Sequence, residues 1–387
     1  MLKKIAVFST ADFVPPTGGA EIAIGEIAKR LPQYDFDLFC ARLDRSRAKF
    51  EKIGNVRIFR IGIGLPIFDK LLLAFRGHSR TLKQHEREPY GLIWVVMASY
   101  GGIPAVKVKE KIGLPYLLTL QEGDPLEAIE KKGRLIRPYF KKMFVLADGL
   151  QAISKFLLDW GISMGFRGKV ARIVPNGVDL KNFQTELPEA TAGELKMRLG
   201  YGAGDKVLIT TSRLVRKNAV GDVIKALKSL PAEVKFLVLG VGSEEEMLKT
   251  LAKDLGVSDR VRFLGLVSHD EMPKYLHLAD IFIRPSLSEG LGSSFLEAMA
   301  AGLPVIATPV GGIPDFLFDP TANPDKEPTG LFCKVEDPAS IAEKVNLLLR
   351  DSALRSRIAD NGRRLAEEKY DWAAVAGQMN DIFNKLS

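Results

Sequence analysis

The sequence predicts an α/β protein with two domains, each built on a doubly wound parallel sheet. Three observations support this fold class. The chain has 387 residues, which is too many for one ordinary hydrophobic core. In both halves, short apolar runs alternate with segments long enough to be crossover helices. Glycine-containing turns follow several of these runs, where a parallel sheet binds its ligand.

The first half begins with an apolar strand over 5–8, followed by a loop with Gly18 and Gly19 and a helix over 20–31. Further strands are expected over 37–41, 56–61, 92–98, 116–120, 149–153 and 172–174. The segments between most of these strands are long enough for crossover helices, so we expect a parallel, Rossmann-like sheet.

Asp35 and Asp37 form an Asp-x-Asp motif, which is a metal and nucleotide motif in other transferases. Here the two residues flank Phe36 in an alternating strand pattern. This alternation favours an exposed strand face over a binding site.

The second half repeats the same rhythm. Strands are expected over 207–214, 234–239, 261–264, 281–285 and 305–308, with helices over 244–255, 269–279 and 295–301. From 338 to 387 the pattern is helical only, and the last helix begins near Asp371 and Trp372. We therefore expect one Rossmann-like domain over 1–183, a second over 184–370, and a helix over 371–387 that packs back on the first domain.

Composition limits the possible partners and compartments. A net charge of +8 favours acidic partners, but no helix-turn-helix or zinc-finger pattern supports nucleic acid, so none is expected. No apolar run reaches membrane-spanning length and no signal peptide precedes the first strand, which predicts a cytoplasmic chain. The two cysteines, Cys40 and Cys333, are interpreted as small apolar fillers, and neither a disulfide nor a cysteine-based metal site is expected.

The segment 66–87 mixes apolar residues with lysine and arginine, and 134–142 adds a second basic cluster. A basic amphipathic helix can lie on an anionic membrane surface. An ordinary surface helix with its apolar side on the sheet is the favoured interpretation, and peripheral contact with the inner face of the cell membrane stays open.

The stretch from Ser286 to Gly312 carries the most informative pattern. An apolar β-branched run is followed by a glycine-containing turn and then by strong helix formers, which is the order strand, loop and helix N-terminus. Such a junction presents backbone N–H groups and a positive helix end to phosphate. Glu289 and Glu297 flank the turn, and carboxylates accept hydrogen bonds from sugar hydroxyls.

Other predicted strand ends carry complementary groups. Arg213 and Lys217 would donate to a diphosphate, and Gly18 and Gly19 would let the backbone approach it closely. Each feature alone has a plain structural alternative: a two-glycine turn, a solvated helix start, or a carboxylate near a helix N-terminus. Their shared position at strand ends favours a nucleotide-sugar site.

The pattern from Ser286 to Glu297, with its Glu-x7-Glu spacing, resembles the retaining glycosyltransferase family 4. Supporting matches are Gly18, Gly19, Ala20 and Glu21; Pro175 to Asp179; Ser212, Arg213, Leu214 and Lys217; and Gly265, Leu266 and Val267. The resemblance covers essentially the whole chain. It implies a GT-B architecture, in which two Rossmann-like domains face each other across a cleft and a last helix crosses back. By the same resemblance, the acceptor-side domain would be 1–183 and the nucleotide-sugar donor domain 184–370.

The resemblance also implies roles for individual residues. Glu297 would bind the donor ribose, Glu289 the transferred sugar, Arg213 and Lys217 the diphosphate, and the backbone near Val267 the base. The remaining substrate-binding candidates are Gly18, Gly19, Glu21, Gly290, Leu291, Gly292, Ser293 and Ser294. The implied donor is a UDP- or GDP-sugar and the acceptor a glycan, lipid-linked or small-molecule hydroxyl, with no cofactor and no metal.

One departure from the family pattern concerns proton transfer. Many members carry a histidine where this chain has Gln121. An amide cannot take a proton at neutral pH, so an acid-base role would pass to Glu122, Asp124 or the donor phosphate. The catalytic candidates are therefore Arg213, Lys217, Glu289, Gln121 and Asp124. A nucleotide-sugar epimerase and a non-catalytic sugar-nucleotide binding protein are the alternative functions.

Overall fold

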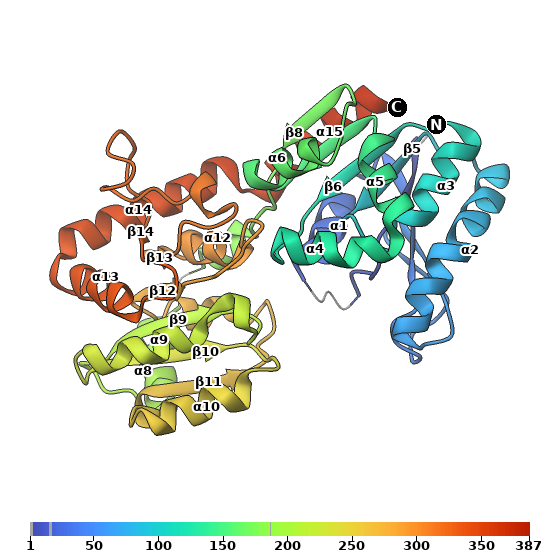
Figure 1. Ribbon diagram of the computed structural model, residues 1–387. Helices are drawn as coiled ribbons and strands as arrows, with labels where there is room; N and C mark the ends of the chain where they lie inside the picture. Colours follow the sequence, from blue (N-terminus) through green and yellow to red (C-terminus); the bar gives the residue numbers. More distant parts are fainter. Residues whose placement is uncertain (1–2, 15–17, 186) are drawn as a thin grey trace. The chain divides into compact units, whose positions relative to one another are not determined.

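The computed structural model describes residues 3–14, 18–185 and 187–387 (Figure 1). The chain folds into two compact units, one running up to Gly177 and including Trp372–Ser387, the other spanning Val178–Asp371. The boundary expected at 183/184 falls just inside the second unit. Each unit contains one mainly parallel sheet, which confirms the predicted fold class.

The first unit has an eight-stranded sheet in the order β3-β4-β2-β1-β5-β6-β7-β8. Its strands are β1 (Lys3–Phe8), β2 (Tyr34–Ala41), β3 (Phe50–Ile53), β4 (Val56–Ile61), β5 (Leu92–Val96), β6 (Tyr116–Leu120), β7 (Gly149–Ala152) and β8 (Val170–Ile173). All pairs are parallel except β3 with β4, and β3 is a strand that the sequence pattern did not indicate. The strand order reverses between β1 and β5, so the loops after these strands meet at one edge.

The helices of this unit are α1 (Gly19–Arg30), α2 (Pro66–Arg87), α3 (Gly102–Ile112), α4 (Leu126–Gly133), α5 (Arg137–Val145), α6 (Lys155–Ser163) and α15 (Trp372–Leu386), with a 3-10 turn over Arg134–Ile136. The last helix, α15, packs against this sheet as predicted. The Phe383 ring centroid lies 5.6 Å from that of Tyr34 and 5.3 Å from that of Trp94. Trp372 and Met379 belong to the same buried core.

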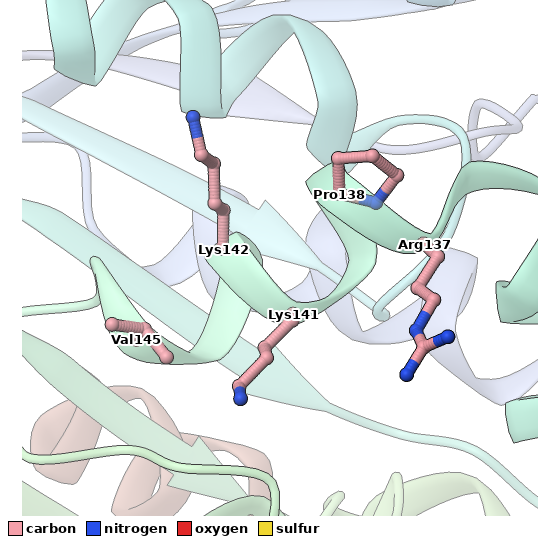
Figure 2. A pocket seen from close by; sticks show the side chains of 5 residues that line it. All are labelled: Arg137, Pro138, Lys141, Lys142 and Val145. Atoms are coloured by element: carbon pink, nitrogen blue, oxygen red, sulfur yellow. The ribbon is translucent and has the colours of Figure 1, made fainter.

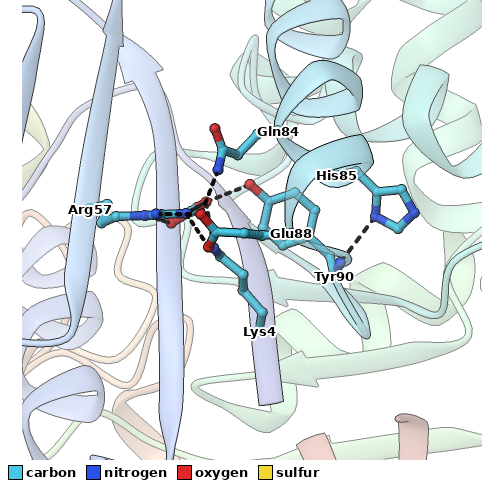
Figure 3. A network of polar contacts seen from close by, with 7 residues as sticks. Lys4, Arg57, Gln84, His85, Glu88 and Tyr90 are labelled. Carbon is cyan, nitrogen blue, oxygen red and sulfur yellow. Dashed lines mark hydrogen bonds and ion pairs between the residues drawn. The ribbon is translucent and has the colours of Figure 1, made fainter. Parts of the chain in front are cut away.

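The expectation that Asp37 lies on an exposed strand face is wrong. Its side chain is completely buried, and Arg57 forms an ion pair with it at 2.7 Å. The Tyr90 hydroxyl donates to it at 2.5 Å, and burial beside this carboxylate raises the pKa of Tyr90. Figure 3 shows the surrounding network, in which Glu88 bridges Lys4 and Arg57. The Asp-x-Asp motif therefore contributes a structural ion pair that fixes the end of α2 on the sheet.

Helix α2 only partly matches the favoured interpretation of an apolar side packed on the sheet. Leu73 and Ala74 are buried, as that interpretation requires. Four other apolar side chains face solvent, with exposed fractions of 82% for Ile67, 49% for Phe68, 41% for Leu71 and 66% for Phe75. The first turns of α2 therefore carry an apolar stripe that the sheet does not cover.

The second unit has a six-stranded parallel sheet in the order β11-β10-β9-β12-β13-β14. Its strands are β9 (Lys206–Thr211), β10 (Val234–Leu239), β11 (Val261–Gly265), β12 (Ile281–Arg284), β13 (Val305–Ala307) and β14 (Leu331–Phe332). The order reverses between β9 and β12, which places the switch point of this sheet between the two strands whose following loops carry the predicted donor residues.

The α-helices of this unit are α7 (Leu180–Phe183), α8 (Glu189–Arg198), α9 (Val220–Ala226), α10 (Glu245–Asp254), α11 (Met272–Leu276), α12 (Ser293–Ala300), α13 (Pro338–Arg350) and α14 (Ser352–Lys369). Short 3-10 helices cover Arg216–Asn218, Leu227–Ser229, Ser258–Arg260 and Ile313–Asp315. The helix expected over 269–279 is only the short α11, and the strand expected to reach residue 214 ends at Thr211.

Candidate functional site

The loops after β9 and β12 meet at the switch point of the second sheet. The Leu287 N–H donates to the Lys217 carbonyl at 2.6 Å, which joins the two loops directly. Asn218 donates to the Arg213 carbonyl at 2.7 Å and braces the turn that carries both cations. Arg213 is exposed and Lys217 is half-buried. Both cations thus follow the central strand of the sheet, at the edge where ligands bind.

The loops after β10 and β11 extend the same edge. A Cβ at Gly240 would lie 1.9 Å from the Ser212 carbonyl oxygen, and its φ of +136° also requires glycine. The Gly240 N–H donates to the Gly265 carbonyl at 2.7 Å, which fixes the start of the loop that holds the half-buried Val267. The two loops are therefore held side by side along the edge.

The glycine-rich turn after β12 leads directly into α12. Gly292 adopts a φ of +87° and stands at the N-cap, where it has no side chain to satisfy the first N–H groups of the helix. Leu291 is buried, with 1% of its surface exposed, so its side chain belongs to the core. The turn therefore offers backbone N–H groups near Ser293 and Ser294, together with the positive end of the helix dipole.

Glu289 is held in place by an arginine that the sequence pattern did not indicate. Arg284, the last residue of β12, donates to Glu289 Oε2 at 2.7 Å. The other carboxylate oxygen, Oε1, accepts from the Gly290 N–H at 3.1 Å. Only 12% of the Glu289 side chain is exposed. The carboxylate is therefore fixed at the start of the turn, with lone pairs left for a sugar hydroxyl.

Glu297 lies on α12 and pairs with His269, which the sequence analysis did not single out. His269 Nε2 lies 3.2 Å from Glu297 Oε1, and this hydrogen bond raises the pKa of the imidazole. The ring of Phe183 packs edge-on against His269, with centroids 5.1 Å apart. The carboxylate is thus oriented from one side, and 13% of its side chain remains exposed.

The first unit carries the remaining predicted residues at the edge of its own sheet. Gln121 accepts from Asn176 Nδ2 at 3.0 Å through its amide oxygen. Asp124 has a side chain that is 47% exposed and forms an ion pair with Lys132 at 3.6 Å. Gly18 and Glu21 are close neighbours, since a Cβ at Gly18 would lie 3.1 Å from Glu21 Oε2.

Gly18 and Gly19 are exposed at the start of α1. Residues 15–17, the part of this loop with the two prolines, lie outside the described residues.

Glu122 is the most perturbed acid at this edge. It is 3% exposed, and burial raises its pKa to about 7. Oε1 accepts from the Ala98 N–H at 2.7 Å, whereas Oε2 is buried with no hydrogen-bond partner among the described residues. Glu122 can therefore carry a proton near neutral pH, but its side chain is nearly closed off from solvent.

A second group of cations lies on α5. Arg137, Lys141 and Lys142 line a pocket together with Pro138 and Val145, and Figure 2 shows their side chains on the helix. Lys142 also forms an ion pair with Glu110 at 2.5 Å. Part of the basic cluster expected over 134–142 therefore lies on an exposed face of α5, beside Pro138 and Val145.

Two Rossmann-like units in one chain, with cations and carboxylates gathered at the switch point of the second sheet, define a GT-B type fold. Solved structures with the same fold include sucrose-phosphate synthase from Thermosynechococcus elongatus, at a TM-score of 0.84 and 22% identity over 99% of both chains. The Anabaena protein HepE in complex with UDP and glucose is also similar, at a TM-score of 0.79 and 20% identity over 99% of this chain and 100% of that one.

Two protein-family models match the chain, one in each unit. The model for Glycosyltransferase Family 4 matches residues 17–182, and the model for Glycosyl transferases group 1 matches residues 194–365. Between them these models account for both units. The protein belongs to glycosyltransferase family 4.

Curated relatives include a GDP-mannose-dependent monoacylated alpha-(1-6)-phosphatidylinositol monomannoside mannosyltransferase from Corynebacterium glutamicum, 33% identical over 64% of this chain and 64% of that protein. The alpha-monoglucosyldiacylglycerol synthase of Streptococcus pneumoniae is 28% identical over 79% of this chain and 70% of that protein. The match thus spans less than two thirds of the first relative's length. Among the described residues, no helix is long and apolar enough to cross a bilayer.

Proposed function

We propose that the protein is a retaining glycosyltransferase that moves a sugar from a nucleotide diphosphate sugar to an acceptor hydroxyl. One observation carries this proposal: two cations, two oriented carboxylates and a helix N-terminus converge on the switch-point edge of the second sheet. Arg213 and Lys217 lie in the loop after β9, and this loop is hydrogen-bonded to the loop after β12. A diphosphate fits between cations and backbone N–H groups of this kind.

The two carboxylates suit the neutral parts of such a donor. Glu289 and Glu297 are each oriented by a basic partner, and each keeps lone pairs for hydroxyl groups. We assign Glu297 to the ribose, Glu289 to the transferred sugar, and the backbone near Val267 to the base. The backbone of Gly290, Leu291, Gly292, Ser293 and Ser294 completes the contacts to the sugar and the diphosphate.

The reaction proceeds on one face of the sugar. The bond between the anomeric carbon and the diphosphate oxygen breaks, and the acceptor oxygen bonds to the same face of that carbon. The departing phosphate oxygen takes the acceptor proton. Arg213 and Lys217 stabilise the charge that develops on the leaving group, which is a role for fixed cations close to the diphosphate.

The first unit supports this route for the proton. Gln121 is an amide held by Asn176, so it can orient an acceptor hydroxyl but cannot remove its proton. Glu122 is enclosed, and Asp124 is paired with Lys132 at an exposed position. We therefore assign Gln121 and Asp124 to acceptor contacts. Gly18, Gly19 and Glu21 border the same edge of the sheet.

The names of similar proteins support a choice of donor and acceptor classes. One relative is named as GDP-mannose-dependent, and a solved structure of the same fold holds UDP-glucose, so we propose a UDP- or GDP-sugar as donor. One relative is named as a phosphatidylinositol monomannoside mannosyltransferase and another as a monoglucosyldiacylglycerol synthase, so we propose a lipid-linked acceptor ahead of a free glycan or a small molecule.

The surface of the first unit supports a lipid acceptor. Helix α2 begins just after β4, at the edge that faces the acceptor in this proposal, and its first turns expose Ile67, Phe68 and Phe75. Lys107 of α3 lies 5.4 Å from the ring of Phe75 and 5.3 Å from that of Tyr139 on α5. An apolar stripe and a basic helix face are thus linked through one lysine. We propose that this face rests on an anionic membrane on the cytoplasmic side.

The test is a calorimetric binding screen of UDP- and GDP-sugars, followed by product analysis with lipid acceptors. One donor should bind to the wild type, and a Glu297→Ala variant should lose about 10- to 100-fold in affinity, because a hydrogen bond to a charged group contributes about 1.5–3 kcal/mol. An unchanged affinity in the variant would count against the donor site. A product formed without acceptor would indicate an epimerase, and binding without any released nucleotide would indicate a sugar-nucleotide binding protein.

A further inference from the structure

Among the residues that the structure describes, Arg284 is the one strongly buried cation at the switch-point edge of the second sheet. None of the roles proposed above uses it. It ends β12 in the centre of the sheet, and 7% of its side chain is exposed. Burial lowers the pKa of its guanidinium, while the charges of Glu289 and Glu297 oppose that effect. An arginine at this depth requires partners, because an isolated buried charge is strongly unfavourable.

The guanidinium finds those partners in three different elements. Nη2 donates to Glu289 Oε2 at 2.7 Å, and Nη1 donates to Ser294 Oγ at 2.7 Å. Nη1 also reaches the Thr211 carbonyl at 3.4 Å. The cation lies 4.3 Å from the ring centroid of Phe295. One side chain thus connects the end of β9, the glycine-rich turn and the first turn of α12.

The backbone of the turn is shaped around this side chain. A Cβ at Gly292 would come within 2.9 Å of Arg284 Nη2 and within 2.4 Å of the Phe295 ring. The positive φ of Gly292 and its missing side chain therefore let the turn close over the guanidinium. Removing the guanidinium would leave Glu289 without its ion pair and the turn without its support.

We propose that Arg284 is a positioning residue that holds the Glu289 carboxylate and the first turn of α12 in the arrangement that receives the donor sugar. The proposal rests on the donor site proposed above. Arg284 acts through Glu289 and Ser294 and does not itself contact the sugar. A lysine cannot replace it fully, because only the planar fork of arginine can donate to both partners from two nitrogens at once.

A double-mutant cycle separates positioning from a general effect on the fold. The variants are Arg284→Gln, Glu289→Gln and the double variant, with kcat/KM measured for the donor found in the screen. We expect Arg284→Gln to lose about 100-fold, the size of effect that a 1 Å displacement of a catalytic arrangement produces. The same change in the Glu289→Gln background should cost less than about threefold, since the group that Arg284 positions is then already impaired. Equal losses in both backgrounds would overturn the proposal.

Two further variants sharpen the cycle. Arg284→Lys should recover part of the lost kcat/KM. Arg260→Gln is the matched control, because Arg260 is a partly buried arginine that binds backbone carbonyls of Leu227, Pro231 and Val234 before β11, at the opposite edge of the same sheet. It should lower the urea midpoint of unfolding and leave kcat/KM within twofold. A loss of kcat/KM in Arg260→Gln that matches the loss in Arg284→Gln would show a general effect of destabilisation and overturn the positioning role.

The cycle is also read in urea unfolding, which does not depend on the proposed function. If Arg284 holds Glu289, Arg284→Gln should lower the urea midpoint of unfolding less in the Glu289→Gln background than in the wild type. If the changes in midpoint of the two single variants simply added up in the double variant, the proposed support of Glu289 by Arg284 would be overturned, even in an active enzyme. A wild type that neither binds nor turns over any UDP- or GDP-sugar would refute the proposed function instead, and the unfolding cycle would still decide whether Arg284 holds Glu289.

Discussion

The candidate site residues at the carboxyl edges of the two sheets differ in how their charges are partnered. At the edge of the second sheet, charged groups are paired or clustered: Arg284 with Glu289, His269 with Glu297, and Arg213 near Lys217. At the edge of the first sheet, the inner groups are a tethered amide, Gln121, and a buried acid whose pKa is raised. In the function that we propose, the second edge would receive the charged diphosphate and the first edge the neutral hydroxyl group of the acceptor.

The arrangement of charge explains how both edges remain stable. The charged pairs at the second edge, Arg284 with Glu289 and His269 with Glu297, are already oriented by hydrogen bonds, so the proposed donor site would need little reorganisation to receive a diphosphate. Glu122 at the first edge has no cationic partner among the contacts that shift its pKa, and burial alone raises it. A carboxyl that is partly neutral near pH 7 avoids a buried charge close to the position where we place the acceptor.

The largest effect should come from removing the Lys217 ammonium group at the edge of the second sheet. Lys217→Ala should lower kcat by about 100- to 1,000-fold, the range found when one preorganised group facing developing charge is removed. The Lys217 carbonyl, which joins the two loops, is retained in this variant. Steady-state kinetics with the identified donor provide the measurement. Arg216→Ala, an exposed neighbour in the same turn, is the control and should stay near wild type.

Full turnover in Lys217→Ala and also in Arg213→Ala would remove both cations from the mechanism. The contrast between the two edges would then no longer rest on Arg213 and Lys217 as diphosphate-binding cations. A loss in Arg216→Ala as large as that in Lys217→Ala would instead point to damage to the loop.

The second effect concerns Glu122. Its pKa is raised from 4.5 to about 7, so the folded chain holds this proton between pH 4.5 and 7 while the unfolded chain releases it. This residue therefore makes the unfolding free energy fall as pH rises through that window, by about 3 kcal/mol at most, and adds no slope above it. Glu122→Gln should remove this part of the pH dependence.

Urea unfolding of wild type and Glu122→Gln at pH 5 and pH 8 measures the difference. The variant should gain stability relative to wild type at pH 8, because it keeps a neutral amide where the wild type must ionise. An identical pH dependence in the two proteins would contradict the enclosed, neutral carboxyl. Asp124→Asn is the control, because it changes a half-exposed acid in the same loop after β6. It should leave the pH dependence of the unfolding free energy as in wild type.

Most of the fold could be predicted from the sequence, because hydrophobic periodicity and glycine turns are local signals. Both sheets follow from such patterns, whereas the return of α15 to the first unit is expected because its helix is left over after the second sheet and because the family resemblance implies it. Strand β3 is not indicated by the sequence because it is a short edge strand, in which pairing rather than local pattern decides the structure. Helix α11 is shorter than its pattern indicated, with proline at its start.

The site was less predictable wherever a residue depends on a partner distant in the sequence. Arg284 occupies a strand position that would suit an apolar side chain, and only the fold shows that it reaches Glu289 and Ser294. His269 pairs with Glu297 across two elements, and no local spacing indicates this. Asp37 was misassigned for the same reason, since its partner Arg57 comes from the neighbouring strand β4.

The smallest effect concerns the exposed apolar stripe of α2, which we propose rests on the membrane. Phe75→Ser should weaken binding to vesicles that contain anionic phospholipid by about 2 kcal/mol at most, because two thirds of this side chain is exposed and can be transferred to lipid. Vesicle sedimentation at low salt measures the change. Met197→Ser removes a similarly exposed side chain from the second unit and should bind as wild type does. Equal binding by the wild type and both variants, or no binding by the wild type, would contradict a membrane-facing α2. The two edges would then differ only in their charged groups.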